Sequence, residues 1–557
     1  MRKSLVLCLG AALLAAACVE VDNSVGQGLI DKSLLFDTYT ETLPLTQIQL
    51  KSAEALSGYS DTRLTIGAIR DEVFGLTTRD AAFTLIPQAD TIDLGDNPTA
   101  VSFSVYFSAD TVSCADPTEK NIFQNLYVTE LTSRLPQGDT RNTQDIPHGE
   151  ELITEGLPIY NGTGPLRFYF TQEFAQKYVD VLKELGPVLY DRASEEAGNE
   201  DYINKYEEYV DLLPGVYIQT DEPDGIGGRI NLFNFSSLSV ESQYYTANYN
   251  VARLKVHSTW KGVQKDSTFL FFPGEPEFYD EQYYIDNNAK FYQYCFNRTS
   301  QSTQNGPATD AVLVEGGGGL KPVILASELK EITSDAIIAK GGDPSKAVII
   351  KATIILPFER PLDYEELDYF PSVLSPTICT KETDADTGKE YTTFAGLTDA
   401  SVSSEDQGNV DFANLWYSPD ITYHLQELLD RDDLDIETNA DIWLLTVHTE
   451  TVADANGSLM DDAYYQQMLY ASYYNSLYGG GYGGYGYGSY GGYGSSSYSY
   501  SNYYNYMMLA QMMAASQQQT YSTTTELDKD RYYRAVLNGN NDERFPCFQI
   551  TFAIPKE

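Results

Sequence analysis

Histidine, tryptophan and positive charge are scarce in this sequence. It has four histidines and three tryptophans, and its 36 lysines and arginines stand against 80 aspartates and glutamates, for a formal net charge of −44 over 557 residues. A chain this acidic cannot neutralise a phosphate backbone, so we exclude nucleic acid as a partner. The sequence also has no P-loop, no GxSxG elbow and no HExxH motif. The common sequence signatures of catalysis are therefore missing.

Cysteine is infrequent as well. The four cysteines beyond the N-terminal region are widely spaced and never form a CxxC pair, which argues against a zinc site: Cys114, Cys295, Cys379 and Cys547. In an oxidising compartment four cysteines allow three pairings, and the sequence does not choose between them. Disulfides and buried free thiols both stay open.

Long apolar runs are missing except at the N-terminus. Arg2 and Lys3 precede an apolar stretch from Ser4 to Ala17, which is 14 residues long. A lasting membrane-spanning helix needs roughly 20 residues, so the stretch is typical of a secretory signal peptide over residues 1–17.

The end of this stretch predicts a lipid anchor. Leu14 to Cys18 read LAAAC, a lipobox that predicts cleavage between Ala17 and Cys18 and attachment of diacylglycerol to the Cys18 thiol. Acyl chains such as palmitate would then hold the protein without spanning the membrane, with residues 18–30 as a lipidated tether. The alternative is an ordinary signal peptide with a chance cysteine. Glu20 and Asp22 resemble the surface-export tag of Bacteroidota lipoproteins, so we expect an outer-membrane protein on the cell surface.

The body of the chain has mostly a two-residue period. Apolar and polar residues alternate in many short runs that Gly, Pro, Asn and Asp clusters separate, as antiparallel strands require. The runs lie at 101–107, 125–131, 166–170, 215–220, 230–235, 251–260, 347–356, 442–447 and 547–554. Strands do not alternate with helices, which argues against a parallel α/β sheet. We predict a mainly β fold of two antiparallel β-sandwich (jelly-roll-like) units.

Three helical stripes interrupt this pattern. Two lie in a helical insertion at about 172–213: one runs from Phe174 to Leu185 and ends at Gly186-Pro187, and the other runs from Tyr202 to Leu213. A third starts at Ser418-Pro419, which we expect to cap it. All three are interpreted as packing elements.

The glycine run at 316–319 is the best division point of the chain. It predicts an N-terminal β-rich domain over 31–310 and a C-terminal β-rich domain over 311–557. The second domain carries a Tyr/Gly-rich insertion at about 459–524, where the glycine density predicts a disordered loop. A tolerated low-complexity insertion is one interpretation. The other is an adhesive aromatic arm, because tyrosines stack on sugars and other rings; its candidate residues are Tyr482, Tyr485, Tyr487, Tyr490 and Tyr493.

Ligand sites are weakly indicated. In TDADTGKE (383–390), Asp384, Asp386 and Glu390 surround a glycine, which makes them weak calcium candidates against the simpler reading of a solvated acidic loop. We expect no other cofactor. EGGGGLKP (315–322) is like a phosphate cradle only superficially, and we predict a turn there.

One stretch resembles a known family. IGAIRDEVFGLTTRDAAFTL (66–85) is similar to the signature of the Bacteroidota lipoprotein family called domain of unknown function 4270, and the matching residues are Ile66, Gly67, Asp71, Phe74, Gly75 and Ala81. Further segments follow in the family's order: LYVTELTSRL, LLPGVYI, GIGGRINLFNF, EGGGGLKPVIL, KAVIIKATIIL and RAVLNG. Ile66 replaces the usual leucine. The resemblance implies a β-rich outer-membrane or surface lipoprotein, with no catalytic residues to transfer.

Three classes of function compete. We favour a non-catalytic binding or scaffold lipoprotein, with outer-membrane barrel proteins and other lipoproteins as partners in an assembly complex. The alternative is a glycan-binding or adhesion protein of the fimbrillin type, which would use a removable N-terminal strand. A glycan-cleaving enzyme is the least favoured class. It needs two carboxylates about 5–10 Å apart, and the sequence does not indicate which.

Overall fold

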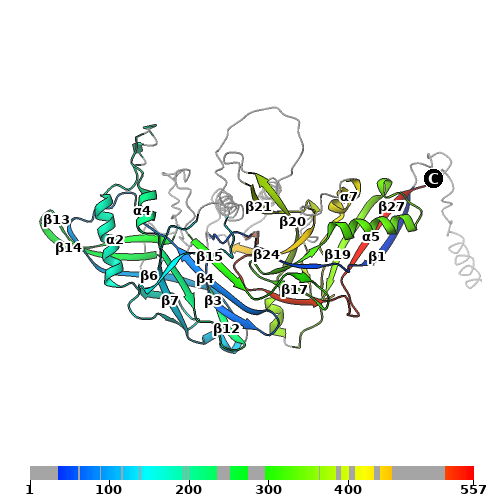
Figure 1. Ribbon diagram of the computed structural model, residues 1–557, viewed down its shortest axis with the longest axis horizontal. Coiled ribbons are helices and arrows are strands. Elements are labelled where there is room, and N and C mark those ends of the chain that lie inside the picture. The colour runs from blue at the N-terminus through cyan, green and yellow to red at the C-terminus, as the bar shows by residue number, and fades with distance from the viewer. Residues whose placement is uncertain are drawn as a thin grey trace, which may run out of the picture.

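A computed structural model describes the protein over the following residues: 36–54, 56–60, 63–87, 89–114, 117–136, 140–191, 193–194, 197–199, 201–234, 251–273, 295–362, 364–383, 390–399, 408–431, 440–453 and 521–556. Over these residues the protein is mainly β, and every strand pair is antiparallel, as predicted. The elements form two lobes side by side along the long axis of the molecule (Figure 1).

The first lobe contains one large sheet with the central order β14-β13-β6-β12-β3-β4-β11-β7-β8. Strand β5 pairs with β14, β10 with β6, β15 with β4, and β9 with β7. The strand bounds are β3 Arg63–Asp71, β4 Gly75–Phe83, β5 Leu85–Pro87, β6 Asp96–Cys114, β7 Gln124–Leu131, β8 His148–Leu152, β9 Ile159–Tyr160, β10 Leu166–Tyr169, β11 Val216–Thr220, β12 Gly227–Asn234, β13 Val251–Trp260, β14 Val263–Pro273 and β15 Cys295–Gln301.

The second lobe is built from smaller sheets. Their orders are β1-β27-β19-β23-β22, β16-β2-β18-β24-β20-β21 with β25 on β24, and the pair β17-β26. The bounds are β1 Phe36–Pro44, β2 Gln49–Ser52, β16 Gly306–Pro307, β17 Ala311–Glu315, β18 Leu320–Ile324, β19 Val348–Pro357, β20 Val373–Thr383, β21 Glu390–Gly396, β22 Val410–Asp411, β23 Trp416–Tyr417, β24 Ile442–Ala453, β25 Tyr521–Leu527, β26 Arg534–Asn538 and β27 Cys547–Pro555.

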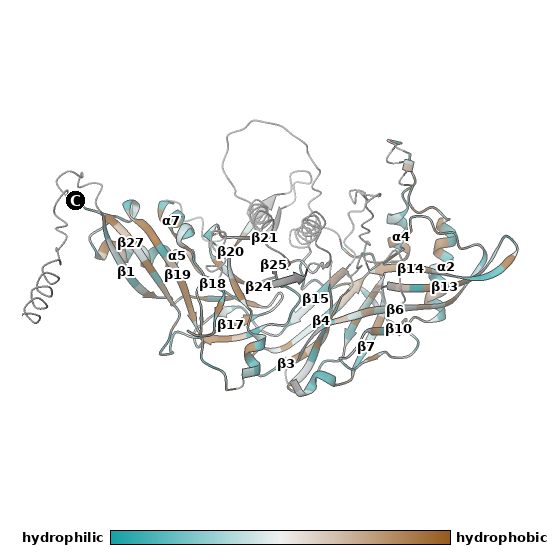
Figure 2. Cartoon of the chain, turned by 180° about the vertical axis from the view of Figure 1, so that it is seen from behind, coloured by the Kyte–Doolittle hydropathy of each residue, from teal (hydrophilic) through white to brown (hydrophobic). Residues whose placement is uncertain are grey.

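Each lobe has its own principal hydrophobic core. One core gathers buried residues between Leu64 and Cys295, and the other joins Leu45, Ile48 and Leu50 to residues between Ala308 and Ile554. Hydrophobic stretches run along strands of both lobes (Figure 2). The alternation that predicted strands explains the burial: in β13, residues 252, 254, 256 and 258 are buried and the residues between them are not.

The start of the chain belongs to the second lobe. β1 pairs with the last strand, β27, from Phe36 opposite Pro555 to Pro44 opposite Cys547, and β2 pairs with β18. The predicted division at 310/311 therefore does not separate the sheets, because strands at 36–52 pair with strands beyond residue 311. Sequence order could not show this, since a pairing between the two chain ends leaves no local pattern.

The helices follow the predicted stripes, with shifted ends. Helix α2 (Gln172–Leu185) ends at Gly186, whose φ is 82°, and the Thr171 hydroxyl accepts a hydrogen bond from the Phe174 amide at its start. Helix α4 (Tyr206–Leu212) starts four residues later than its stripe. Two 3₁₀ turns in the second lobe, η4 (Pro344–Lys346) and η5 (Tyr364–Tyr369), and one in the first, η2 (Pro117–Asn121), complete the connections.

Two helices of the second lobe differ from expectation. Helix α7 (Thr422–Asp430) is capped by carboxylates, because Asp420 accepts from the Thr422 amide at 2.8 Å and Asp399 accepts from the His424 amide at 3.0 Å. The predicted Ser418-Pro419 cap is therefore wrong. Helix α5 (Ala326–Ala339) was not predicted, because its apolar residues do not make a clear stripe. No helix in the described ranges is both long and apolar enough to cross a membrane.

Candidate functional site: the polar junction between the lobes

Most of the predicted site residues lie outside the described part of the chain. These are Ala17, Cys18, Asp384, Asp386, Tyr482, Tyr485, Tyr487, Tyr490 and Tyr493. Glu390 is the first residue of β21. Within the described residues there is no group of three or more His, Cys, Asp or Glu side chains that could hold a metal ion. None of the four body cysteines forms a disulfide there, and Cys114 and Cys295 are buried.

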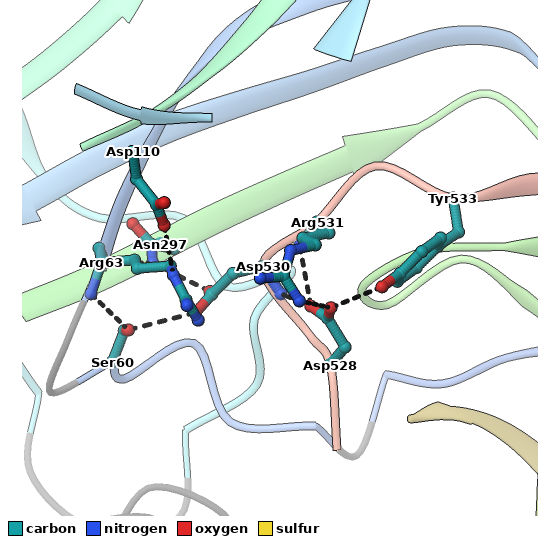
Figure 3. Close-up of polar contacts among 8 residues, drawn as sticks. All are labelled: Ser60, Arg63, Asp110, Asn297, Asp528, Asp530, Arg531 and Tyr533. Atoms are coloured by element: carbon teal, nitrogen blue, oxygen red, sulfur yellow. Dashed lines mark hydrogen bonds and ion pairs between the residues drawn. The ribbon is translucent and has the colours of Figure 1, made fainter. Parts of the chain in front are cut away.

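The structure instead brings charged residues together where the two lobes meet. Residues 528–534, which we call the clasp segment, run from the end of β25 to the first residue of β26. Asp528 fixes the segment to the second lobe, because its amide donates to the Thr446 carbonyl and its own carbonyl accepts from the Thr446 hydroxyl, both at 3.0 Å. The carboxylate of Asp528 accepts from Arg531 Nη1 at 3.0 Å and from the Tyr533 hydroxyl at 2.7 Å (Figure 3).

The electrostatics of Asp528 favour its charged form. Burial alone would raise the pKa of this carboxyl. Arg531, through its charge and its amide, and the Tyr533 hydroxyl overcome that cost and leave the pKa below its usual value. Burial together with the Asp528 charge raises the pKa of Tyr533. The pair is therefore a fixed donor and acceptor near neutral pH and does not exchange protons there.

The next acid fixes the same segment to the first lobe. Asp530 accepts from Asn297 Nδ2 on β15 at 3.1 Å and from the Ser60 hydroxyl at 3.3 Å. Asn297 also donates to the Arg63 carbonyl at 2.9 Å, and Arg63 Nε reaches Asp110 at 2.7 Å (Figure 3). One stretch of chain thus ties strands β3, β6 and β15 to β24.

The clasp segment extends this contact beyond Figure 3. The Lys529 ammonium donates to the Tyr59 carbonyl, and Arg534 forms an ion pair with Asp71 at the end of β3. The ring of Tyr532 packs among Ile69, Ile230 and Leu232 of the first lobe. These contacts are partly or fully buried, so they hold more strongly than exposed pairs would.

The glycine turn at 316–319 packs against a buried arginine. Arg79 of β4 is 1% exposed, and a Cβ on Gly317 would lie 2.2 Å from its Nη2 atom. Gly317 has φ +56°, a left-handed backbone conformation that favours glycine. The lack of room for a Cβ beside Arg79 requires glycine as well. The predicted turn at 315–322 is confirmed, since β17 ends at Glu315 and β18 starts at Leu320.

The same turn encloses a lysine. Lys321 is fully buried, and its ammonium donates to the carbonyls of Glu315, Gly317 (2.9 Å) and Gly319 (3.2 Å). Burial lowers the pKa of Lys321, and the Glu315 carboxylate acts against that shift. Glu315 in turn accepts from Thr303 at 2.5 Å and from the Leu320 amide at 2.9 Å. The charged groups of Lys321 and Glu315 therefore stabilise the turn.

Several polar atoms at this junction have no hydrogen-bond partner among the described residues. Arg79 Nε and Nη2, both amide atoms of Asn142 and the Thr299 hydroxyl are examples. Burial lowers the pKa of Arg79, opposed by Asp530, Asp528 and Glu315. Sequence analysis missed Arg79 and Lys321, because neither lies in a run whose alternation had predicted a strand. The hydrogen bonds and ion pairs of the junction fix the geometry of the side chains in it.

The residues of the family-like signature have structural roles at this junction. Asp71 Oδ1 accepts from the amides of Val73 (2.7 Å) and Phe74 (3.1 Å), which closes the β3–β4 hairpin, while its other oxygen binds Arg534. Gly75 completes the turn with φ +69°. Ile66 and Ala81 are fully buried. The stretch therefore forms the β3–β4 hairpin, which the clasp segment contacts through Arg534.

Comparisons with known proteins found nothing similar: no family model, no curated protein and no solved structure matches this chain.

Proposed function

We propose that this protein is a non-catalytic, lipid-anchored scaffold of the outer membrane, exposed on the cell surface, which presents one lobe to binding partners. Anchoring at Cys18 and the resemblance to domain of unknown function 4270 are parts of this proposal. Outer-membrane barrel proteins and other lipoproteins are the partners that a tethered body of this kind suits. Two jelly-roll-like sandwiches, one for each lobe, are the finer fold that we propose, and the two separate cores support it.

The position of the chain ends carries this proposal. Phe36 pairs with Pro555, so the start of the body lies beside the C-terminus, at the end of the long axis opposite the β13–β14 hairpin (Figure 1). Cys18 is 18 residues before Phe36, which gives a tether with a reach of at most about 60 Å. An anchor at that end leaves the first lobe farthest from the membrane.

The junction supports the same function. A scaffold has to hold its binding face at a fixed position relative to its anchor. Two lobes joined only by a short linker would move independently and could not do this. Here the clasp segment binds both lobes, through Thr446 on one side and Asn297 and Asp71 on the other, and these contacts are partly or fully buried. The two lobes therefore act as one arm.

The experiment is a mild-detergent pulldown of the tagged full chain from its own outer membrane, followed by mass spectrometry. We expect stoichiometric barrel proteins or lipoproteins with the wild type. We expect their loss with Cys18→Ser, which should also lose incorporation of an alkyne-palmitate label. Cys379→Ser is the matched control, and it should keep both the label and the partners.

Two results would overturn the proposal. If Cys18→Ser still incorporates the label, Cys18 is not the lipid-anchored residue. If the wild type is recovered without partners, the scaffold role is refuted and adhesion or glycan binding is favoured. The fimbrillin-like alternative predicts release of β1 from β27 and its replacement by a second chain, which cross-linking of cysteines placed at Thr40 and Thr551 would detect. These residues face each other with their hydroxyls 3.0 Å apart.

A further inference from the structure

A surface hollow of about 480 Å³ lies on the first lobe. It is lined by Phe123, Ile159, Tyr160, Asn161, Thr163, Pro165, Leu166 and Arg167. Phe123 is 78% exposed and Ile159 is 59% exposed. Large apolar side chains at that exposure, beside polar groups in a concave site of this volume, are typical of ligand sites.

The walls of the hollow are held in place by a buried arginine. Arg229 Nη1 donates to the carbonyls of Lys120 (2.7 Å) and Ile122 (2.8 Å), and its Nη2 donates to the Tyr160 carbonyl (3.2 Å). Phe123 directly follows Ile122, so this wall of the hollow is fixed next to the Phe123 ring. The wall at 160–164 also closes on itself, because the Tyr160 hydroxyl donates to the Gly164 carbonyl at 2.8 Å. The hollow is therefore pre-formed, which lowers the entropy cost of binding.

Arg167 connects the hollow to an aromatic platform on the outer face of the sheet. β10 and β13 flank β6, with Arg167 opposite Tyr106, and with Tyr169 and Arg253 on either side of Ser104. Residues that face each other across antiparallel strands share a face, so two arginines and two tyrosines lie together. The Arg167 guanidinium lies over the Tyr106 ring, 4.5 Å from its centre, and Tyr169 is 56% exposed.

The two arginines of this platform are not neutralised. Neither Arg167 nor Arg253 has a hydrogen bond or ion pair with another residue of the described chain, although acids outnumber bases more than twofold. Burial and then the charge of Arg167 lower the pKa of Arg253, as expected for neighbouring like charges. Along the same strand Lys255 and His257 are both paired with Asp266 at 2.8 Å. Arg167 and Arg253 thus differ from the next two basic residues of β13, which are both paired with an acid.

We propose that the hollow and the platform together bind an acidic carbohydrate, with the carboxylate or sulfate of a sugar between Arg167 and Arg253 and sugar rings against Tyr106, Tyr169 and Phe123. This inference goes beyond the scaffold function proposed above, because it adds a carbohydrate to the membrane-protein partners. Guanidinium groups bind planar and tetrahedral oxyanions through paired N–H donors. Tyrosine rings present a flat apolar face and a polar edge, which matches a sugar ring.

The geometry favours a carbohydrate over an acidic peptide. A peptide bound to a sheet usually adds to a strand edge through backbone hydrogen bonds, whereas the platform offers side chains on the face of three paired strands. The contacts available are ring faces, guanidinium groups and the short polar side chains of Ser104, Asn161 and Thr163. An acidic peptide is therefore the competing outcome of the test.

The test is calorimetric titration of the intact lipoprotein, purified in mild detergent, with four probes. They are an oligogalacturonate, a sulfated dextran oligosaccharide, a neutral maltooligosaccharide and a short polyglutamate. We expect one or both acidic sugars to bind, with an affinity that falls as salt rises. Carboxylate and sulfate sources are distinguished by which of the first two binds more tightly.

Variants assign the binding to the platform. Arg167→Gln with Arg253→Gln should weaken the acidic sugar at least tenfold, and Arg167→Lys should weaken it several-fold because the planar fork is lost. Lys255→Gln is the matched control, since that charge is already paired, and it should stay within twofold. Melting temperatures equal to the wild type establish that the variants are folded.

The outcomes separate this site from the scaffold role. The site is refuted if no acidic sugar binds, if the neutral sugar binds as tightly, if polyglutamate binds more tightly, or if the double variant binds like the wild type. None of these results bears on recovery of membrane partners through Cys18. A pulldown without partners would likewise leave the arginine-dependent binding intact.

Discussion

The junction between the lobes is most directly tested at Gly317, by Gly317→Ala. Two costs add in this variant. The first is backbone strain at φ +56°, which costs an L-residue about 1–2 kcal/mol. The second is the clash of the new Cβ with Arg79 Nη2, 2.2 Å away. A flexible side chain could move aside, but Arg79 is 1% exposed and has no space to do so. Overpacking of this kind typically costs about 1–3 kcal/mol.

Gly341→Ala separates the two costs. Gly341 also has a left-handed backbone, with φ +82°, but a Cβ there would meet nothing within 4 Å. It should lose only the strain of about 1–2 kcal/mol. The difference between the two variants then measures the contact with Arg79.

Urea unfolding monitored by tyrosine and tryptophan fluorescence measures both variants, and small-angle scattering reports whether the lobes separate. We expect Gly317→Ala to be less stable than Gly341→Ala by about 1–3 kcal/mol, and a larger radius of gyration before global unfolding in that variant alone. Equal stabilities for the two variants would refute the view that the glycine turn and Arg79 form a tight joint.

Three further predictions follow from buried groups. Arg79→Met should change stability by less than about 1.5 kcal/mol and should suppress the clash of Gly317→Ala, because Nε and Nη2 of Arg79 have no partner among the described residues; a loss above about 3 kcal/mol in urea unfolding would contradict this. Tyr533→Phe should cost about 1–2 kcal/mol by the same measurement, since the hydroxyl donates to Asp528 at 2.7 Å, and an unchanged stability would show that the clasp segment contributes little. Burial raises the pKa of Asp399 to about 6 and lowers the pKa of His424 to about 4. Asp399 therefore contributes stability at low pH that is lost as the pH rises from about 4 to 6, whereas His424 contributes stability above about pH 6.5 that is lost as the pH falls to about 4. Asp399→Asn removes only the first, so its stability relative to the wild type should rise by about 2–3 kcal/mol between pH 4 and 6.5, and parallel curves would refute this assignment.

Local structure was predictable wherever the burial pattern was local. The alternation in 251–260 identified β13 at its correct bounds, and Gly186 identified the end of α2. Helix α5 escaped because both Glu328 and Thr333 are buried among its apolar residues, which blurs the stripe. Glu328 is buried because it accepts hydrogen bonds from the backbone amides of Thr46 and Gln47. These partners lie some 280 residues away in the chain, so no local window of sequence contains the reason.

The same limit applies to the sites. The junction depends on contacts of Asp530 and Arg534 with Asn297 and Asp71, which are distant in the sequence. Nothing in the sequence of the clasp segment indicates these partners. The platform was missed because Arg167 and Arg253 each look like an ordinary outward residue of an alternating strand. Only the pairing of β10 and β13 with the same strand, β6, puts them on one face. Composition did contain a clue, since an unpaired arginine is conspicuous in a chain of net charge −44.

The acidity of the chain gives the platform its selectivity. A body of charge −44 repels acidic ligands over most of its surface, and screening limits each charge to a range of about 8–10 Å in physiological salt. An acidic sugar is therefore held only where positive charge is unpaired over that range. Glu155, whose amide donates to the Tyr169 carbonyl, lies next to Tyr169 at the rim of this area. Glu155→Gln should consequently tighten binding of the acidic oligosaccharide, by severalfold at low salt and less at high salt, in the same titration. Unchanged affinity at low salt would mean that the arginines act through direct contacts alone and that the field of the surrounding carboxylates does not select the ligand.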